Sequence, residues 1–206
     1  GAFGGSVIFT EKYFHLLRGL EKSDSFCFNA HKTLGVPLST SILVVNKKDA
    51  LNESFSNKAS YLYQTNDDDY NLGYTSFECG RRNNALKFWV LWKAIGTKGL
   101  KSMVEHEFNL AQYAREYVKN NNDYKIYSFD NSLSICFNYK DYDPIDLCTK
   151  LYEHNQIMVG FGYFNKDCFI RLVTINSENT EQDLQLFFRK LEEFCSLNDD
   201  LIKKIN

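Results

Sequence analysis

The stretch SFCFNAHKTLGVPLSTSILVV, residues 25–45, decides how the first half of this chain folds. Its two ends, Ser25–Phe28 and Ser39–Val45, are rich in the apolar, aromatic and β-branched residues that favour strands. The second run follows Pro37 and is almost continuously apolar or β-branched, a pattern typical of a strand buried on both faces. We therefore predict a buried, hairpin-like pair of strands that flanks a functional loop at residues 29–35.

Lys32 lies in that loop, directly after His31 and shortly before Gly35, in an otherwise apolar neighbourhood. Burial disfavours the charged form of a lysine, and the neutral amine can attack an aldehyde. The pattern therefore favours Schiff-base chemistry at Lys32. The alternative is a lysine on a surface turn that extends its ammonium into water, and the loop residues by themselves leave both interpretations open.

The composition is that of a globular protein with little affinity for polyanions. The 206 residues are 44% hydrophobic, and 24 Lys and Arg residues stand against 26 Asp and Glu, for a net charge of −2. The chain has no basic block of the kind that binds nucleic acid or an anionic membrane. It also has no apolar run of the roughly 18 residues that a membrane span requires. We expect neither nucleic acid nor a membrane as a partner.

The cysteines and the acidic residues argue against a metal site. The six cysteines form no Cys-x-x-Cys pair and no zinc-type spacing with histidine. Free thiols suit a reducing compartment, so we expect a cytoplasmic protein. The acidic run at residues 67–69 lacks the glycine turn and the distal glutamate of a calcium loop, and we interpret it as part of a solvated loop.

The composition of the chain changes near residue 98. Residues 55–80 are rich in Asn, Asp, Ser and Gly, which predicts a long, flexible loop. The helix that we predict over residues 81–95 is apolar on nearly every side and is therefore expected to be buried. Glycines at 96 and 99 are expected to break it before an amphipathic helix begins. We predict two domains, residues 1–98 and 99–206.

The second domain is predicted to be a small α+β domain, and one short helix is expected over residues 11–19 of the first. The elements predicted for the second domain are strands at 124–127, 133–137, 156–160 and 169–175 and helices at 144–154 and 181–195. Thr180 and Asp183 have the spacing of a capping box for the last helix.

A series of short motifs resembles the group II pyridoxal-phosphate-dependent amino-acid decarboxylases, which include the glutamate, cysteine-sulfinate and aromatic-amino-acid enzymes. The resemblance covers almost the entire chain, and the motifs follow one another in the order of that family. They are GG at 4–5, SDS at 23–25, NAHK at 29–32, GVPL at 35–38, YLYQ at 61–64, CGRR at 79–82, ALKFW at 85–89, WKA at 92–94, MVG at 158–160 and FIR at 169–171.

The resemblance implies an α/β fold: the end of the large domain of a fold-type I pyridoxal-phosphate enzyme, followed by a small α+β C-terminal domain. It implies pyridoxal 5'-phosphate as the cofactor and a homodimer as the assembly. In the family, an aspartate that keeps the cofactor ring protonated lies immediately before the segment that matches Gly1–Gly5. The chain opens there without Met, so we expect a fragment that is inactive alone and is completed by its own N-terminal part.

The resemblance also assigns roles to single residues. Lys32 matches the lysine that forms the internal aldimine, and His31 matches a histidine near the cofactor phosphate. Arg171 matches the arginine that binds the substrate α-carboxylate, a task suited to a planar, bidentate donor. From the residues alone, His31 could instead make a structural hydrogen bond and Arg171 an ordinary ion pair.

Tyr70 lies in the loop that, in the family, folds over the substrate and brings a tyrosine to protonate it. Tyr74 competes for that role, and both could be plain loop aromatics. Arg81 and Arg82 also match the family, but at the start of a helix a packing or interface role is the simpler interpretation. Tryptophans 89 and 92 are interpreted as core residues.

The expected reaction is the decarboxylation of an L-amino acid. The motifs at 35–38 and 61–64 favour an acidic substrate, namely glutamate, aspartate or cysteine sulfinate, and leave diaminobutyrate or an aromatic amino acid open. Two other classes stay open as well. One is a different fold-type I enzyme, such as an aminotransferase or a lyase, and the other is a non-catalytic relic.

Overall fold

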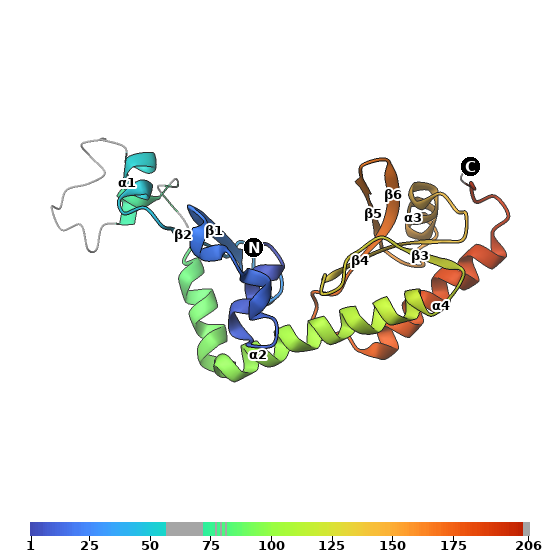
Figure 1. Ribbon diagram of the computed structural model, residues 1–206, viewed down its shortest axis with the longest axis horizontal. Helices are drawn as coiled ribbons and strands as arrows, with labels where there is room; N and C mark the ends of the chain where they lie inside the picture. The colour runs from blue at the N-terminus through green and yellow to red at the C-terminus, as the bar shows by residue number, and fades with distance from the viewer. Residues whose placement is uncertain (57–71, 77, 79, 81, 204–206) are drawn as a thin grey trace. The chain divides into compact units, whose positions relative to one another are not determined.

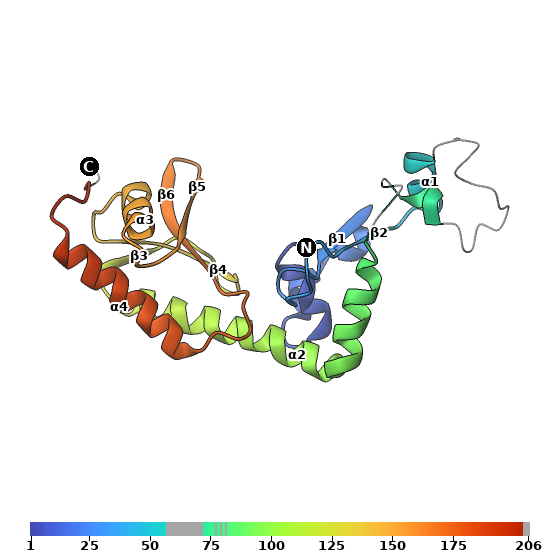
Figure 2. The same cartoon turned by 180° about the vertical axis from the view of Figure 1, so that it is seen from behind.

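The computed structural model describes residues 1–56, 72–76, 78, 80 and 82–203. The chain divides into two compact units, residues 1–97 and residues 98–206 (Figure 1 and Figure 2). Each unit contains a β-sheet of its own.

The first unit is built on a two-stranded antiparallel sheet. Strand β1, Ser25–Asn29, pairs with β2, Ser41–Val45. Because side chains alternate along a strand, every second residue of each strand points to the same face. On that face the ring of Phe28 contacts those of Phe9 and Phe88, at centroid distances of 6.3 and 6.4 Å. The predicted hairpin-like pair is confirmed.

The hairpin is not buried on both faces, and that part of the prediction is wrong. The side chains of Leu43 and Val44 are 46% and 58% exposed. A strand is buried on both faces only where a layer of structure covers each face. The described residues of the first unit supply part of one such layer.

Short 3-10 helices precede the sheet in place of the helix predicted over residues 11–19. They are η1, Gly4–Phe9, η2, Phe14–Leu17, and η3, Leu20–Lys22. The α-helix predicted over residues 11–19 is therefore wrong, because the structure has the 3-10 helix η2 flanked by turns there. Gly19, with a φ of 96°, then turns the chain toward η3.

Among the described residues, three further helical elements follow the sheet: α1, Ala50–Phe55, η4, Leu72–Thr75, and α2, Asn84–Lys119. Helix α2 contains one non-helical residue, Gly96, whose φ is 67°. Glycine adopts this left-handed region at little cost because it has no Cβ. The break predicted at Gly96 is confirmed, whereas Gly99 lies within the helix.

The first part of α2 is more exposed than predicted. Leu86, Trp89 and Val90 are 51%, 57% and 51% exposed. Trp92, which is itself 40% exposed, packs edge-on against Phe9 at a centroid distance of 5.3 Å. The apolar composition indicates a helix with two covered sides, but the described residues cover only one.

The second unit is a four-stranded antiparallel sheet with helices, an α+β arrangement. The strand order is β3-β4-β6-β5. Its elements are β3, Tyr124–Ile126, β4, Ser134–Tyr139, α3, Pro144–Glu153, β5, Gly160–Phe164, β6, Asp167–Val173, and α4, Glu181–Leu197.

The core of the second unit lies between one face of this sheet and the helices α2 and α4. Phe137 on β4, Ile170 on β6 and Phe188 on α4 are each at most 1% exposed. The ring of Phe188 stacks on Tyr117 of α2 at 4.1 Å and lies 5.8 Å from the ring of Phe137. Burying a side chain of this size contributes about 1.5–3 kcal/mol.

In the second unit, the capping box predicted for the last helix is confirmed, and one predicted strand lies elsewhere. Thr180 and Asp183 form the predicted capping box of α4. The strand predicted at 156–160 instead occupies 160–164, because β5 and β6 are joined by a two-residue turn at which Asn165 has a φ of 54°. In a hairpin the turn sets the register, and here it overrides the apolar run before it.

Glu107 on α2 is a buried carboxyl group inside the second unit. Its side chain is 0% exposed, and neither carboxyl oxygen has a hydrogen-bond partner among the described residues. Burial without a partner disfavours the ionised form, and it raises the pKa of Glu107 to about 9. The folded protein therefore keeps this proton well above the pH at which the unfolded chain loses it.

We predict that Glu107 makes the stability of the chain fall as the pH rises. The contribution of Glu107 to the free energy of unfolding is fully present below 4.5, the pKa of this group in the unfolded chain. It is lost progressively until the pH passes about 9, at up to about 1.4 kcal/mol per pH unit. Glu107→Gln should remove this part of the slope. The measurement is urea unfolding by circular dichroism between pH 5 and pH 9.

Glu105→Gln is the matched control on the same helix, because the Glu105 carboxylate is partly exposed and pairs with Lys101 at 4.0 Å. This control should keep the slope of the unsubstituted chain. An equal slope in Glu107→Gln and in the unsubstituted chain would contradict the prediction.

Candidate functional site

The turn between β1 and β2 holds the backbone of Lys32 at the end of β1. The Lys32 N–H donates to the Asn29 carbonyl at 3.1 Å, and the Gly35 N–H donates to the Lys32 carbonyl at 3.0 Å. Gly35 has a φ of 61°, which is why a glycine is suited to this position. Ala30 and Leu34 are at most 1% exposed. The turn is therefore anchored, and the half-buried side chain of Lys32 extends from a fixed backbone.

His31 is oriented by the other end of the same turn. Its Nδ1 lies 2.8 Å from the carbonyl oxygen of Thr40, and its backbone N–H donates to that same oxygen at 3.3 Å. Since a carbonyl oxygen only accepts, Nδ1 carries a proton, and in the neutral ring Nε2 is left as an acceptor. Thr40 is itself fixed, because its hydroxyl donates to the Pro37 carbonyl at 3.0 Å.

The side chain of Lys32 meets an aromatic residue that the sequence analysis did not single out. Its Nζ lies 4.9 Å from the centroid of the Phe3 ring, within the range of a cation–π interaction. The sequence carried a weak signal, an aromatic residue directly before the glycine pair Gly4-Gly5. No local pattern indicated that its ring faces Lys32.

Arg171 belongs to the second unit, on the sheet face opposite the core. It is exposed and lies directly across from Cys136 on β4 and Gly160 on β5. A Cβ added at Gly160 would meet no atom within 4 Å, so the space beside Arg171 is open. Burial raises the pKa of the Cys136 thiol, and the positive charge of Arg171 opposes that rise. The charge of Arg171 therefore acts on its cross-strand neighbour Cys136.

The remaining residues that the resemblance singles out are Tyr70, Arg81 and Arg82. Tyr70 and Arg81 lie outside the described residues, and their roles stay predictions. Arg82 is exposed, and its carbonyl accepts the Asn84 N–H at 2.8 Å, just before α2 begins.

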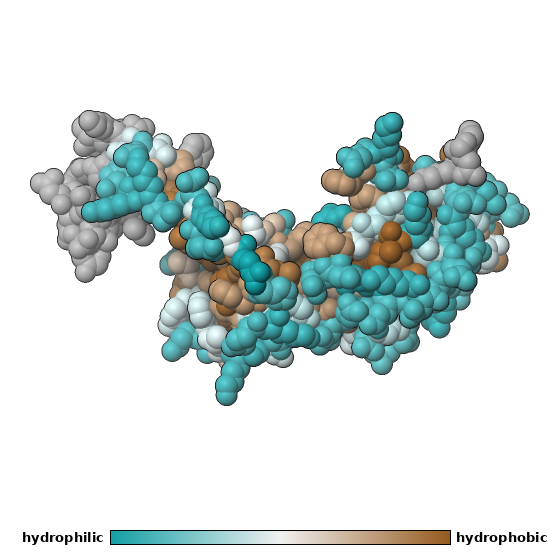
Figure 3. All heavy atoms as spheres, in the orientation of Figure 1, coloured by the Kyte–Doolittle hydropathy of each residue, from teal (hydrophilic) through white to brown (hydrophobic). Residues whose placement is uncertain are grey.

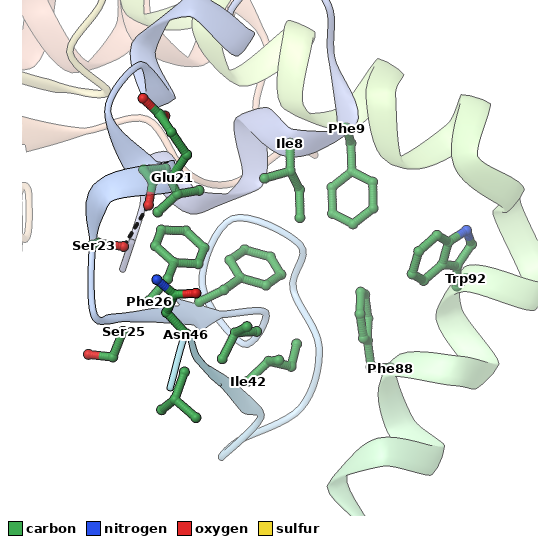
Figure 4. A pocket seen from close by; sticks show the side chains of 14 residues that line it. Ile8, Phe9, Glu21, Ser23, Ser25, Phe26, Ile42, Asn46, Phe88 and Trp92 are labelled. Atoms are coloured by element: carbon green, nitrogen blue, oxygen red, sulfur yellow. Dashed lines mark hydrogen bonds between the residues drawn. The ribbon is translucent and has the colours of Figure 1, made fainter. Parts of the chain in front are cut away.

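An apolar cavity of about 550 Å³ lies between the hairpin and the first part of α2 in the first unit (Figure 4). Phe9, Phe26, Ile42, Phe88 and Trp92 line it, and Lys32 is not among the lining residues. Trp92 lines this apolar space but is 40% exposed, and Trp89 is 57% exposed, so the interpretation of the two tryptophans as core residues is wrong for the described part of the chain. None of the predicted site residues lines this cavity.

The described part of the chain contains no group of three or more His, Cys, Asp or Glu residues placed to hold a metal ion. No helix within it has the length and apolar character needed to cross a membrane.

Comparisons with known proteins show what the chain is similar to. The model of the pyridoxal-dependent decarboxylase conserved domain matches residues 1–140. The acidic amino acid decarboxylase GADL1 of Homo sapiens is 37% identical over an alignment of 222 positions, which covers 97% of this chain and 42% of that protein. The cysteine sulfinic acid decarboxylase of Homo sapiens is 29% identical, covering 93% and 43%. The chain thus spans about two fifths of these curated relatives.

Solved structures agree on the fold. A crystal structure of mouse CSAD superposes with a TM-score of 0.82 at 25% identity, over 94% of this chain and 44% of that one. A tryptophan decarboxylase of Catharanthus roseus superposes with a TM-score of 0.81 at 21% identity, over 95% and 43%, and shows the fold alone. The two units thus have the fold of the pyridoxal-phosphate decarboxylases.

The family match covers more than half of the chain, and it includes the turn that carries His31 and Lys32. This chain belongs to the pyridoxal-dependent decarboxylase family.

Proposed function

We propose that this chain is part of an enzyme that decarboxylates an L-amino acid with pyridoxal 5'-phosphate as its cofactor. The observation that carries the proposal is the anchored turn of β1 and β2. It presents the primary amine of Lys32 from a fixed backbone, next to an imidazole whose orientation is set by Thr40. The family match to residues 1–140 supports the assignment.

The residues of the turn fit this cofactor. A primary amine is the group that bonds to the cofactor aldehyde, and the Lys32 amine is neither hydrogen-bonded nor ion-paired within the described part of the chain. His31 would contact the cofactor phosphate through Nε2, because Nδ1 already donates to Thr40, and Nε2 would have to carry a proton there, since phosphate oxygens only accept. When bound, the cofactor accepts the electrons that remain after carbon dioxide leaves.

Arg171 is our candidate for the residue that binds the substrate α-carboxylate. Arg171 is an exposed residue directly across from Gly160, which has no side chain, and a guanidinium can bind a carboxylate through two parallel N–H groups. An acidic substrate is favoured, because the relatives include an acidic amino acid decarboxylase at 37% identity and a cysteine sulfinic acid decarboxylase at 29%. Tyr70 is our candidate for the proton donor to the substrate carbon.

We propose that further polypeptide of the same protein covers the first unit and completes the site. The chain spans about two fifths of its curated relatives. Apolar side chains lie exposed on the hairpin and on the first part of α2, including Val44 on β2 and Trp89 and Val90 on α2. Figure 3 shows apolar surface over this unit. On this proposal the chain is inactive alone, and the complete enzyme is a homodimer.

The cellular location is part of the proposal as well. Cysteines 27, 136, 148, 168 and 195 form no disulfide within the described part of the chain, which supports a reducing compartment such as the cytoplasm.

Lys32→Ala tests the central assignment. In the full natural protein with added pyridoxal phosphate, we expect a visible absorption band that the variant lacks, because the variant has no amine at this position. Borohydride reduction followed by peptide mass spectrometry should place the cofactor on Lys32. Lys48→Ala, at an exposed position of the same unit, should keep the band. Identical spectra from Lys32→Ala and the unsubstituted protein would exclude the proposed function.

Arg171→Lys tests the carboxylate site. A lysine keeps the charge but cannot bind a carboxylate through two parallel N–H groups, so we expect KM for the amino acid to rise roughly tenfold or more. The absorption band of the bound cofactor should not change. Arg189→Lys, at an exposed position of α4, is the control and should keep the KM of the unsubstituted enzyme. An unchanged KM in Arg171→Lys would contradict the assignment.

A further inference from the structure

The N-terminal segment of the chain packs tightly against β1. A Cβ added at Gly1 would lie 2.7 Å from a ring atom of Phe26 and 2.8 Å from the Cys27 carbonyl oxygen. A Cβ at Gly5 would lie 2.7 Å from a ring atom of Phe28. These distances are too short for a side chain, so the two glycines allow the backbone to approach the strand closely. The segment between them is thereby fixed beside the strand that leads into Lys32.

Phe3 lies between these two glycines, and its own backbone is held. The Ser6 hydroxyl donates to the Phe3 carbonyl at 3.1 Å, and the Gly5 N–H donates to the Gly1 carbonyl at 3.2 Å. Ser6 is 0% exposed. The half-buried ring of Phe3 therefore has a defined position, and it lies 4.9 Å from the Lys32 Nζ.

The Lys32 side chain has few other restraints. Within the described part of the chain its ammonium makes no hydrogen bond or ion pair, and its Nζ contacts the Phe3 ring. A lysine has four rotatable side-chain bonds, so an unrestrained Nζ samples many positions. The negative face of an aromatic ring attracts an ammonium and restricts the positions that Nζ occupies.

We propose that Phe3 is a positioning residue for Lys32, and that its ring holds the lysine Nζ at the place where it meets the cofactor aldehyde. This inference rests on the proposed function and adds to it. A lysine that bonds reversibly to an aldehyde needs its nitrogen in one place, whether or not the bond is formed. The contact requires the face of an aromatic ring, and an aliphatic side chain of similar size cannot replace it.

Three variants of the full natural protein separate positioning from packing. Phe3→Leu keeps an apolar side chain but removes the ring, and Phe3→Tyr keeps the ring face. Phe14→Leu makes the same exchange at a position that is 56% exposed in the same unit, and it serves as the control. Circular dichroism and thermal unfolding report whether each variant folds.

The first measurement follows the lysine without the cofactor. Lysines are methylated with ¹³C-formaldehyde and cyanoborohydride, and the NMR signal of Lys32 is assigned with Lys32→Arg. Methyl groups over a ring face resonate upfield, so we expect the Lys32 signal to be shifted upfield in the unsubstituted protein and in Phe3→Tyr. The shift should be absent in Phe3→Leu. An unshifted signal in the unsubstituted protein would overturn the proposed contact, whatever the fate of the proposed function.

The second measurement is the rate at which the cofactor band appears after pyridoxal phosphate is added. We expect Phe3→Leu to slow this rate roughly three- to tenfold, in line with the strength of a partly buried cation–π contact. Phe3→Tyr and Phe14→Leu should stay within about twofold of the unsubstituted protein. Equal rates in all variants would refute the positioning role and leave the proposed function intact. Slowing by both Phe3 variants would show a packing role instead, and no band in any protein would refute both proposals.

Discussion

The reversal of the chain between β1 and β2 is the constraint on which the candidate site depends. The five cross-strand pairs of the hairpin fix the two ends of the turn, and the Val36 N–H closes it by donating to the Ala30 carbonyl at 3.2 Å. Because both ends are fixed, the turn can present His31 and Lys32 side by side without a helix or a metal to hold them. The orientation of the imidazole and the contact of the amine with Phe3 both follow from this backbone.

The second unit places Arg171 on the sheet face opposite its core. Helices α2 and α4 cover the face that carries Phe137 and Ile170, and the alternation of side chains then places Arg171 on the other face. Phe169 on that face is 8% exposed, whereas Arg171 is exposed. Gly160, directly across from Arg171, has space around it, because a Cβ added there would meet no atom within 4 Å.

Both units leave apolar side chains exposed. In the second unit Phe129, Tyr163 and Phe164 are 73%, 63% and 70% exposed, although Phe137 and Phe188 are buried between sheet and helices. In the first unit the hairpin and the first part of α2 leave Val44, Trp89 and Val90 more than half exposed. An apolar strand and an apolar helix lower their free energy by gaining a covering layer, and we propose such a covering segment for the first unit, which carries the candidate lysine.

The sequence by itself determined the features that depend on neighbouring residues: the strands around Lys32, the break of α2 at Gly96 and the capping box of Thr180 and Asp183. These follow from turn chemistry, strand propensity and capping, which act over a few residues. The sequence also supported the family, because its motifs recur in order. Only the tertiary structure decided that the Phe3 ring faces Lys32, that the Thr40 carbonyl places the ring proton of His31 on Nδ1, and that β5 begins at Gly160. Each of these depends on residues brought together by packing or pairing, and no local pattern records which distant residue will be the neighbour.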